Sequence, residues 1–494
     1  MLKKYRTKIL HVDGDNFFVA CEIARFPHLK GKPVIVGEER GIASAMSYEA
    51  KRLGVHRGMP VFEIRKQFPQ VTILPSHFEL YEQYALKLYQ VLCKYSDTVE
   101  RYSIDECFAL IDESEIERYE DIKSKELKDS SKSTRLSLLE TIKQEAESCL
   151  GITLSFGLAD TKTLAKIGSK YNKPSGCVTI TEQDRIRFLK ETGVGSVWGI
   201  GRAISASLTS YNIKTAYDFI SLDSTFVKKN FREGTLATWH ELRGERYLEV
   251  SGYGESSHTP KSLQSTRSFG KSFDIYSRKL ANGSLQIPRE RSFFLSELSN
   301  HAESLCARLR FYKLKTNKLS FFLKKNTLSN KYISREIEIG FYTDNASDLC
   351  KAINKACKEI FDALDAQLGT RLQSYATKYN GSDLGLYTSY NNSNGAQNST
   401  QNFGFKIKAT GISIYQLKPI EAIQDDLFAT QSKLDSKRQY IEAVDSIISR
   451  IGADSIYLCS SLESKKRRKQ IFNERNLRNK FVYRLPLPYM GEVS

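Results

Sequence analysis

Long apolar runs are missing from this sequence, and their absence narrows the class of protein. No stretch of about 18 consecutive apolar residues occurs, which argues against a transmembrane helix of ordinary length. The first six residues are largely polar and lead directly into a strand pattern, unlike a secretory signal peptide. We therefore expect a soluble, cytoplasmic protein that does not act at a membrane.

Cysteine is present but not patterned. The nine cysteines include no Cys-x-x-Cys pair, which argues against a zinc knuckle, and their scatter does not fit a disulfide framework. We interpret them as reduced and mostly buried small residues.

Acidic residues are few relative to basic ones. The chain has 57 Asp and Glu against 74 Lys and Arg, for a formal net charge of +17. Such a charge indicates a polyanionic partner, most often nucleic acid. With 494 residues the chain is too long for one ordinary core, and about three or four domains are expected.

The order of predicted elements divides the chain into three regions. Apolar periodicity predicts alternating strands and helices to about residue 181, including a helix at 162–171, and then helices alone to 251. Residues 252–263 have the composition of a linker. The region after it has an α+β pattern, with strands at 264–271, 318–325, 332–340 and 404–414 and helices at 290–312 and 346–366.

Two polar segments are expected to lie outside these elements. Residues 113–135 are dense in Lys, Glu, Asp and Ser and predict a solvated insertion. Residues 380–403, rich in Asn, Ser and Gly, predict a disordered loop. Near the C-terminus we expect a helix at about 434–450 and a basic surface run at 465–469.

Three carboxylates stand at the ends of strand-like runs. Asp13 closes the run that begins at Ile9, and Asp105-Glu106 lies between two further strand patterns. Grouped carboxylates raise each other's pKa and need compensating positive charge. Two divalent cations about 4 Å apart would supply it for phosphoryl transfer, and hard oxygen ligands favour Mg²⁺. Because strand neighbours point to opposite faces, both acids can reach one metal pair only at a turn, expected at 103–106.

The residues around these acids resemble three motifs of the Y-family of translesion DNA polymerases. Residues 11–22 resemble the first motif, 103–106 the second, and 151–157 with 162–166 and 173–176 the third. The resemblance implies a multidomain α/β and α+β fold, a right-hand polymerase. Its implied parts are a palm at 1–16 and 79–181, fingers at 17–78, a helical thumb at 182–251, a linker at 252–263, a little finger at 264–420 with the loop 380–403, and a C-terminal extension at 421–494 with a clamp-binding motif.

The same resemblance implies the metal ligands. Asp13, Asp105 and Glu106 would bind two Mg²⁺ ions together with the main-chain carbonyl of Gly14, and Mn²⁺ would substitute.

The implied nucleotide-binding residues are Phe17, Phe18, Ser44, Tyr48, Lys51 and Lys166. Phe18 is the expected steric gate, which would collide with a 2′-hydroxyl and reject ribonucleotides. The chain departs from the family at Lys51, usually arginine, since lysine is a point charge rather than a bidentate fork. It departs again at Ala45, which replaces a hydroxyl residue common there, with Ser44 as its neighbour.

Later motifs imply contacts with DNA and with a sliding clamp. Residues 196–204 resemble a helix-hairpin-helix turn, in which Gly199 and Gly201 let backbone N–H groups approach a DNA phosphate, with Arg202 beside them. Arg267 is expected to follow the template backbone. Residues 424–428 match the clamp-ligand pattern Gln-x-x-Leu-Phe, and the side chains expected to fill a clamp pocket are Gln424, Leu427 and Phe428.

Together these features predict an error-prone, template-directed DNA polymerase of the SOS response. It would add deoxynucleoside triphosphates to the primer of primer-template DNA by two-metal nucleotidyl transfer. The resemblance is closest to the UmuC branch, and dependence on a UmuD-like accessory subunit stays open. One alternative is a nucleotidyl cyclase with a related palm, against which the +17 charge counts. The other is a non-catalytic DNA- and clamp-binding protein, against which the intact acids count.

Overall fold

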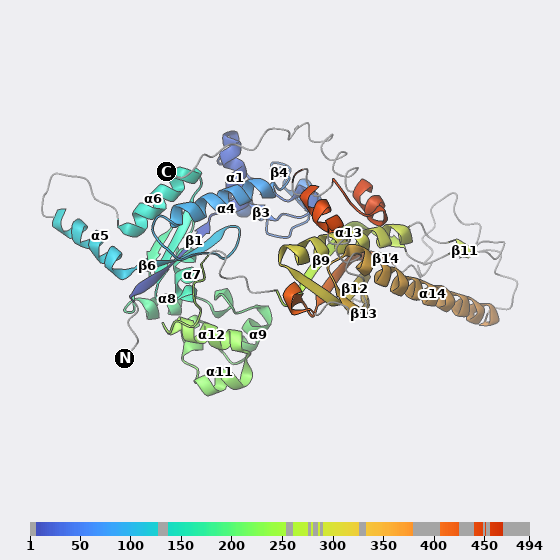
Figure 1. The fold of residues 1–494 in the computed structure, drawn as a ribbon. Helices are drawn as coiled ribbons and strands as arrows, with labels where there is room; N and C mark the ends of the chain where they lie inside the picture. The colour runs from blue at the N-terminus through green and yellow to red at the C-terminus, as the bar shows by residue number, and fades with distance from the viewer. Residues whose placement is uncertain are drawn as a thin grey trace. The chain divides into compact units, whose positions relative to one another are not determined.

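The computed structural model divides into two compact units after Ser257 (Figure 1). It describes residues 6–126, 137–252, 260–274, 278–279, 285–286, 290–325, 332–378, 406–423, 439–447, 450 and 455–467. The division falls within the range expected for the linker. Of the helices in these ranges, none is both long and apolar enough to cross a membrane.

Unit 1 is organised around a five-stranded sheet with the order β5-β6-β1-β7-β8. The strands pair antiparallel except for β7 and β8, which are parallel. Their bounds are β1 Thr7–Gly14, β5 Val99–Arg101, β6 Glu106–Asp112, β7 Leu154–Ala159 and β8 Cys177–Thr179. Because β1 lies between β6 and β7, its last residues are surrounded by two neighbouring strands.

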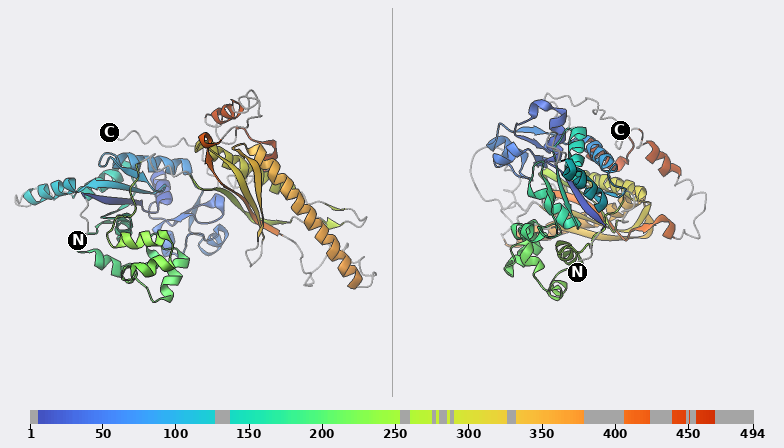
Figure 2. Two further views of the ribbon diagram at one scale, coloured as in Figure 1. Left: turned by 60° about the horizontal axis from the view of Figure 1, so that its bottom comes forward. Right: turned by 90° about the vertical axis from the view of Figure 1, so that its left-hand side faces the viewer.

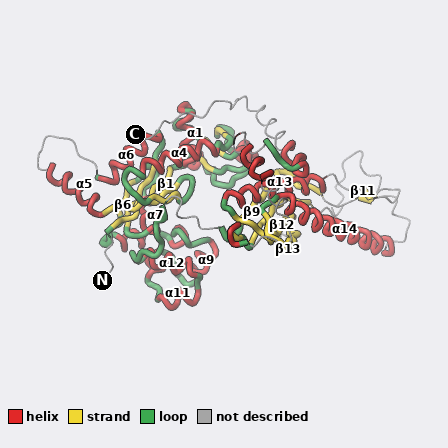
Figure 3. Tube along the Cα trace, viewed as in Figure 1, coloured by secondary structure: helices red, strands yellow, loops and turns green. Residues whose placement is uncertain are grey.

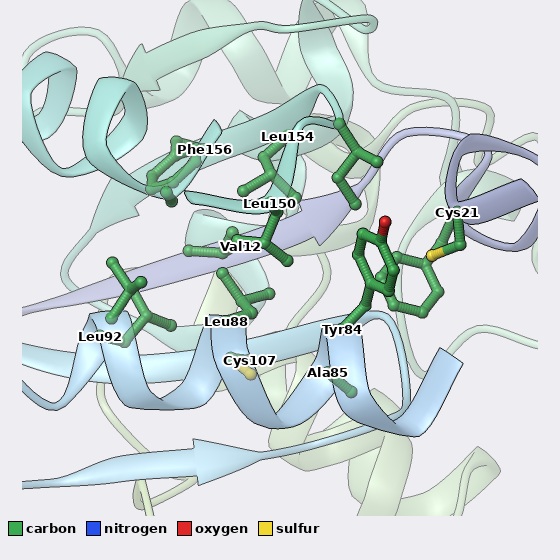
Figure 4. Close-up of a cluster of buried hydrophobic side chains, with 14 of the residues drawn as sticks. Val12, Cys21, Tyr84, Ala85, Leu88, Leu92, Cys107, Leu150, Leu154 and Phe156 are labelled. Carbon is green, nitrogen blue, oxygen red and sulfur yellow. The ribbon is translucent and has the colours of Figure 1, made fainter. Parts of the chain in front are cut away.

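Helices cover both faces of this sheet, as Figure 1 shows. On one face Leu10 and Val12 of β1 pack in a core with α1 (Phe17–Arg25), α4 (Phe78–Leu92) and α6 (Leu138–Leu150). Figure 4 shows part of this core, with Leu88 and Leu92 of α4 directed at the strands. On the other face Ile9 packs with α7 (Lys162–Tyr171) and the helices that follow. The alternation of strand side chains therefore assigns odd-numbered residues of β1 to the α7 face.

Residues 26–77 form a small subdomain with its own core. A three-stranded sheet of order β3-β2-β4 carries two short helices. Their bounds are β2 Val34–Val36, β3 Ala45–Met46, β4 Thr72–Leu74, α2 Tyr48–Arg52 and α3 Val61–Gln67. Ser47 caps α2, because its Oγ accepts from the backbone N–H of Ala50 at 3.2 Å.

The rest of unit 1 is helical, as expected for 182–251. It contains α8 Arg185–Glu191, the short helix η3 Val194–Ser196, α9 Arg202–Ser210, α10 Ala216–Ile220, α11 Ser224–Asn230 and α12 Glu233–Leu242.

Hydrogen bonds from this helical region join it to the sheet. The buried carboxylate of Glu241 accepts from the backbone N–H of Thr163 at the start of α7, at 3.1 Å. Arg246 donates to the carbonyl oxygens of Thr7 at 2.8 Å and Asp160 at 3.1 Å. The helical region is therefore fixed to both β1 and α7.

Unit 2 has an antiparallel sheet with the order β13-β12-β14-β9, and the short β15 pairs with β12. Figures 2 and 3 show this sheet with the long helix α14 beside it. The bounds are β9 Leu263–Asp274, β12 Leu314–Lys325, β13 Tyr332–Thr343, β14 Lys406–Tyr415, β15 Lys418–Pro419, α13 Glu290–Phe311 and α14 Ala346–Lys378. A separate two-stranded pair consists of β10 Arg278–Lys279 and β11 Leu285–Gln286. Leu298 and Leu305 of α13 pack in the core against the sheet.

The segment 455–467 packs on α13 through buried polar contacts. Glu303 Oε1 accepts from the backbone N–H of Leu458 at 2.6 Å and from Ser461 Oγ at 2.8 Å. Ser464 Oγ donates to Glu297 Oε1 at 2.6 Å, and both side chains are fully buried. This part of the C-terminal extension is therefore folded onto unit 2.

Most expected elements are confirmed, and α7 has the expected bounds. Part of the expected solvated insertion 113–135 forms the helix α5 (Glu113–Glu126), in which residues 113–119 are exposed or partly buried. Its Glu and Lys residues are good helix formers despite their charge, and Ile116 and Tyr119 pack against the core. The expected loop 380–403 and the clamp motif 424–428 lie outside the described residues.

Candidate active site

The pairing of β1 and β6 brings the predicted acids together. Asp13 stands directly opposite Glu106 in the antiparallel register. The backbone N–H groups of Tyr102 and Ser103 both donate to the carbonyl of Glu106 at 3.1 Å, which closes a tight turn ahead of β6. The expected turn at 103–106 is therefore confirmed.

This turn also allows the neighbouring side chains of Asp105 and Glu106 to lie on the same side of the chain. Ser103 Oγ donates to Asp105 Oδ1 at 2.5 Å and lies 3.4 Å from Glu106 Oε2. One hydroxyl thus touches both carboxylates, which a regular strand would place on opposite faces. The backbone N–H of Gly14 donates to the carbonyl of Asp105 at 2.9 Å, so the turn is tied to the end of β1.

Two lysines form ion pairs with Asp13 and Glu106. Lys173 Nζ lies 2.6 Å from Asp13 Oδ1 and 3.6 Å from Asp15 Oδ1. Lys166 Nζ lies 2.9 Å from Glu106 Oε2. Within the described ranges, no three His, Cys, Asp or Glu side chains are grouped as a ready metal site.

Burial makes Asp13 an unusual carboxyl group. Loss of solvent raises the pKa of Asp13 to about 6, Lys173 acts in the opposite direction, and Glu106 and Asp105 raise it again. The donor set is oxygen alone, which fits a hard divalent cation such as Mg²⁺.

Close packing of α7 on β7 brings Lys166 to Glu106. A Cβ on Gly157 would lie 2.0 Å from the carbonyl oxygen of Ala165, so only glycine permits this approach. Lys166 is 5% exposed. Its ammonium lies 4.5 Å from the ring centroid of Tyr102 and 5.1 Å from that of Trp198, within the range of cation–π attraction.

The predicted helix-hairpin-helix turn has two different roles for its glycines. Gly199 has φ +91°, and a Cβ there would lie 2.3 Å from Thr238 Oγ1, so this glycine permits packing against α12. Gly201 and Arg202 are exposed at the start of α9, where a phosphate could approach. Trp198 Nε1 donates to Tyr102 Oη at 3.1 Å, which connects the turn to the acids.

The two neighbouring phenylalanines differ in exposure. Phe17 is 3% exposed and packs so closely on Gly14 that a Cβ there would lie 2.6 Å from its ring. The structure therefore places Phe17 in the core, because its face of α1 is directed at the sheet. Phe18 is half-buried, and its ring stacks on that of Tyr81 with centroids 4.5 Å apart.

Tyr48, at the start of α2, is influenced by the charges of the acids. Burial raises the pKa of Tyr48 to about 12, and the charges of Asp15 and Asp13 add to the shift. Lys51 is exposed one turn further along α2. Ser44 Oγ is buried and has no hydrogen-bond partner among the described residues, so it could accept or donate to a ligand.

Sequence reasoning missed Lys173 and Asp15. Asp15 is 2% exposed, and it accepts from Ser155 Oγ at 2.8 Å and from the backbone N–H of Ser175 at 2.6 Å. Both missed residues lie inside the motifs that carried the resemblance. Their presence there was the available signal, but no local pattern indicated that they would meet.

Arg267, the predicted template contact, has a partner within unit 2. Its guanidinium is ion-paired with the buried carboxylate of Glu297. Gln424, Leu427 and Phe428 lie outside the described residues.

Comparison with known proteins gives consistent matches. The model of the impB/mucB/samB family matches residues 12–170, and the model of that family's C-terminal domain matches 289–382, together just over half of the chain. DNA polymerase IV of Clostridioides difficile (strain 630) is 28% identical over 367 residues, which cover 73% of this chain and 90% of that protein. DNA polymerase IV of Shewanella frigidimarina (strain NCIMB 400) is 32% identical over 214 residues, which cover 43% and 56%.

A solved structure shares the fold. The Y-family DNA polymerase chimera Dbh-Dpo4(243-245)-Dbh aligns with a TM-score of 0.55 and 18% identity, over 83% of this chain and 98% of that one.

Proposed function

We propose that this chain, which belongs to the Y-family of DNA polymerases (the impB/mucB/samB family), performs translesion synthesis by two-metal nucleotidyl transfer to a primer 3′-hydroxyl. The observation that carries the proposal is that Asp13, at the end of β1, lies opposite Glu106 in the sheet, while Ser103 in the turn before β6 contacts both Asp105 and Glu106. In this assignment residues 1–16 and 79–181, with the five-stranded sheet of unit 1, are the palm. Residues 17–78 are the fingers, 182–251 the thumb and 264–420 the little finger.

The residues present fit divalent cations. Asp13, Asp105 and Glu106 would hold them with the carbonyl of Gly14, and the all-oxygen donor set favours Mg²⁺, with Mn²⁺ as a substitute. When bound, such ions stabilise the attacking and leaving oxygens of an in-line displacement.

Cationic and hydroxyl groups around the acids supply a place for the triphosphate. Lys166 and Lys173 both contact the acids and would offset phosphate charge. Tyr48 keeps its proton, because the pKa of its phenol is raised to about 12, and can donate a hydrogen bond. Ser44 Oγ, without a partner among the described residues, can do the same, and Lys51 adds exposed charge.

Contacts with DNA and the clamp complete the proposal. Gly201 and Arg202 at the N-terminus of α9 would bind a duplex phosphate without reading sequence. Arg267 would approach the template backbone once its pairing with Glu297 is exchanged for phosphate. Residues 424–428 would recruit the chain to a sliding clamp.

Primer extension tests the proposed activity. Wild-type protein should extend primers on undamaged and lesion-bearing templates, whereas the double variant Asp105→Ala, Glu106→Ala should lose extension. Asp112→Ala is the matched control, because this exposed acid lies at the opposite end of β6. Equal extension by the wild type and the double variant would rule out the proposed site. If the wild type does not extend primers, the remaining candidates are a nucleotidyl cyclase and a non-catalytic DNA- and clamp-binding protein.

The clamp assignment needs a separate experiment. Replacing Gln424, Leu427 and Phe428 together with alanine should weaken clamp-stimulated synthesis and spare synthesis without the clamp. Loss of both would show that the segment has another role.

A further inference from the structure

The proposed sugar gate is part of a paired arrangement between two helices. Phe18 and Glu22 lie one turn apart on α1, and Tyr81 lies on α4 opposite both. The ring of Tyr81 stacks beneath the ring of Phe18, with centroids 4.5 Å apart and planes 13° apart. Its hydroxyl donates to Glu22 Oε1 at 2.6 Å. A single residue thus contacts the gate by its ring and a buried acid by its hydroxyl.

Tyr81 has little freedom to move. Tyr81 and Glu22 are both fully buried. Glu22 Oε1 also lies 2.7 Å from Nδ1 of His77, one turn before Tyr81. Burial and the neighbouring Glu22 both raise the pKa of the Tyr81 phenol, so it stays protonated and remains a donor. Moving the ring would break a hydrogen bond to a buried carboxylate, which is costly.

Burial of the Glu22 carboxylate costs free energy of folding, which points to a role beyond stability. Glu22 Oε2 is buried and has no hydrogen-bond partner among the described residues. A well-packed apolar pair in place of a buried charged group is often neutral or stabilising for a fold. The carboxylate therefore does something that an apolar contact would not, and what it does here is fix Tyr81 in one position.

Phe18 is also confined from the side. The ring of Phe78 meets Phe18 edge-on at 5.7 Å and Tyr81 at 5.8 Å between centroids. With Tyr81 against its face and Phe78 against its edge, the Phe18 ring has no open space on those two sides into which it could retreat from a bulkier sugar.

We propose that Tyr81, held by Glu22, is a positioning residue. It fixes the position of the Phe18 ring relative to the sugar of the incoming nucleotide and thereby determines how strictly the site excludes ribonucleotides. The inference rests on the proposed polymerase function and on Phe18 as the gate. Without the Tyr81 ring, Phe18 could move into the vacated space, away from the sugar. Without the Tyr81 hydroxyl alone, the two stacked rings could shift together.

The test is the ratio of kcat/KM for a deoxynucleotide to that for the matching ribonucleotide, measured with the full chain. Tyr81→Leu should lower this ratio by about tenfold or more, the scale on which a pocket rejects one extra group. Tyr81→Phe should lower it by about threefold, a smaller effect, because the stacked ring stays and only the hydrogen bond to Glu22 is lost. Tyr84→Phe is the control, because it removes a hydroxyl from the same buried helix face, where the Tyr84 ring lies near Cys21 (Figure 4).

The outcomes separate the inference from its premises. An unchanged ratio in Tyr81→Leu, together with relaxed selectivity in Phe18→Ala, would overturn the role of Tyr81 and keep the gate. Unchanged selectivity in Phe18→Ala would overturn the gate itself, and absence of synthesis by the wild type would overturn the proposed function. If Tyr81→Leu does not fold, Tyr81→Phe is the deciding variant, since it keeps the ring and removes only the hydrogen bond to Glu22. Because the proposal requires that Glu22 hold the ring in place, an unchanged ratio in Tyr81→Phe would overturn it.

Discussion

Asp13 and Glu106 face each other across one antiparallel register, and each is ion-paired with a lysine from the same stretch of chain. Lys166 belongs to α7 and Lys173 follows two residues after its end. Positive charge suited to a triphosphate is therefore paired with two of the acids proposed to bind metal. Binding of cations and binding of nucleotide should be coupled. A cation that binds the acids releases the lysines for the triphosphate, and a triphosphate that binds the lysines releases the acids for the cation.

Lys173→Gln should strengthen binding of Mg²⁺ in the absence of nucleotide. The bound cation would no longer displace an ion pair worth about 1 kcal/mol, so the affinity should rise by about fivefold. Isothermal titration of the metal into the full chain measures this directly, and Lys143→Gln, which alters an ion pair on α6 instead, is the control. Weaker metal binding by Lys173→Gln would contradict the coupling.

Trp198→Ala should impair nucleotide insertion although Trp198 lies between η3 and α9, outside the sheet that carries the acids. Its ring lies over the ammonium of Lys166 and its indole N–H holds Tyr102, so its loss leaves this lysine less well placed. We expect kcat/KM for single-nucleotide insertion to fall by about tenfold, the cost of losing a partly buried cation–π contact and a hydrogen bond. Trp198→Phe keeps an aromatic face and should restore part of the loss, whereas equal activity in all three proteins would rule out this role.

Ser464→Ala should destabilise unit 2. The change leaves the buried carboxylate of Glu297 without one of its donors, at a cost of about 1–3 kcal/mol. Chemical denaturation followed by circular dichroism would record the lower midpoint. Lys466→Ala, at an exposed position in the same segment, is the control and should leave the midpoint unchanged. Equal midpoints for both variants would mean that the packing of 455–467 does not support the fold.

Thiol reagents should distinguish two cysteines from the rest. Cys93 and Cys459 are exposed and should react fastest in the native protein. Burial raises the pKa of Cys107 and of Cys357 to about 12, which suppresses the reactive thiolate. Mass spectrometry after a short pulse of iodoacetamide would show the order. Early modification of Cys357 would contradict the packed core of unit 2.

Local pattern was enough to predict much of the fold. The helix at 162–171 has a clear apolar period, and two short apolar runs predict strands, one ending near Asp13 and one beginning at Glu106. The turn at 103–106 could be predicted because two neighbouring acids cannot share a ligand in a straight strand. These predictions depend only on residues close together in the sequence.

Contacts between distant residues could not be predicted in this way. Lys173 and Asp13 are far apart in the chain, and nothing in either segment indicates that they pair. Arg267 was expected to be available to a template, but a buried acid on α13 engages it. The exclusion of Phe17 from the surface likewise follows from the direction in which α1 leaves the sheet. Each of these outcomes depends on tertiary packing rather than on propensity.

The hydrogen bonds that Glu241 accepts and Arg246 donates have a mechanical consequence. They join the helical region 182–251 to the first turn of α7 and to the start of β1. A rotation of this helical region would therefore have to break these hydrogen bonds or displace the helix that carries Lys166.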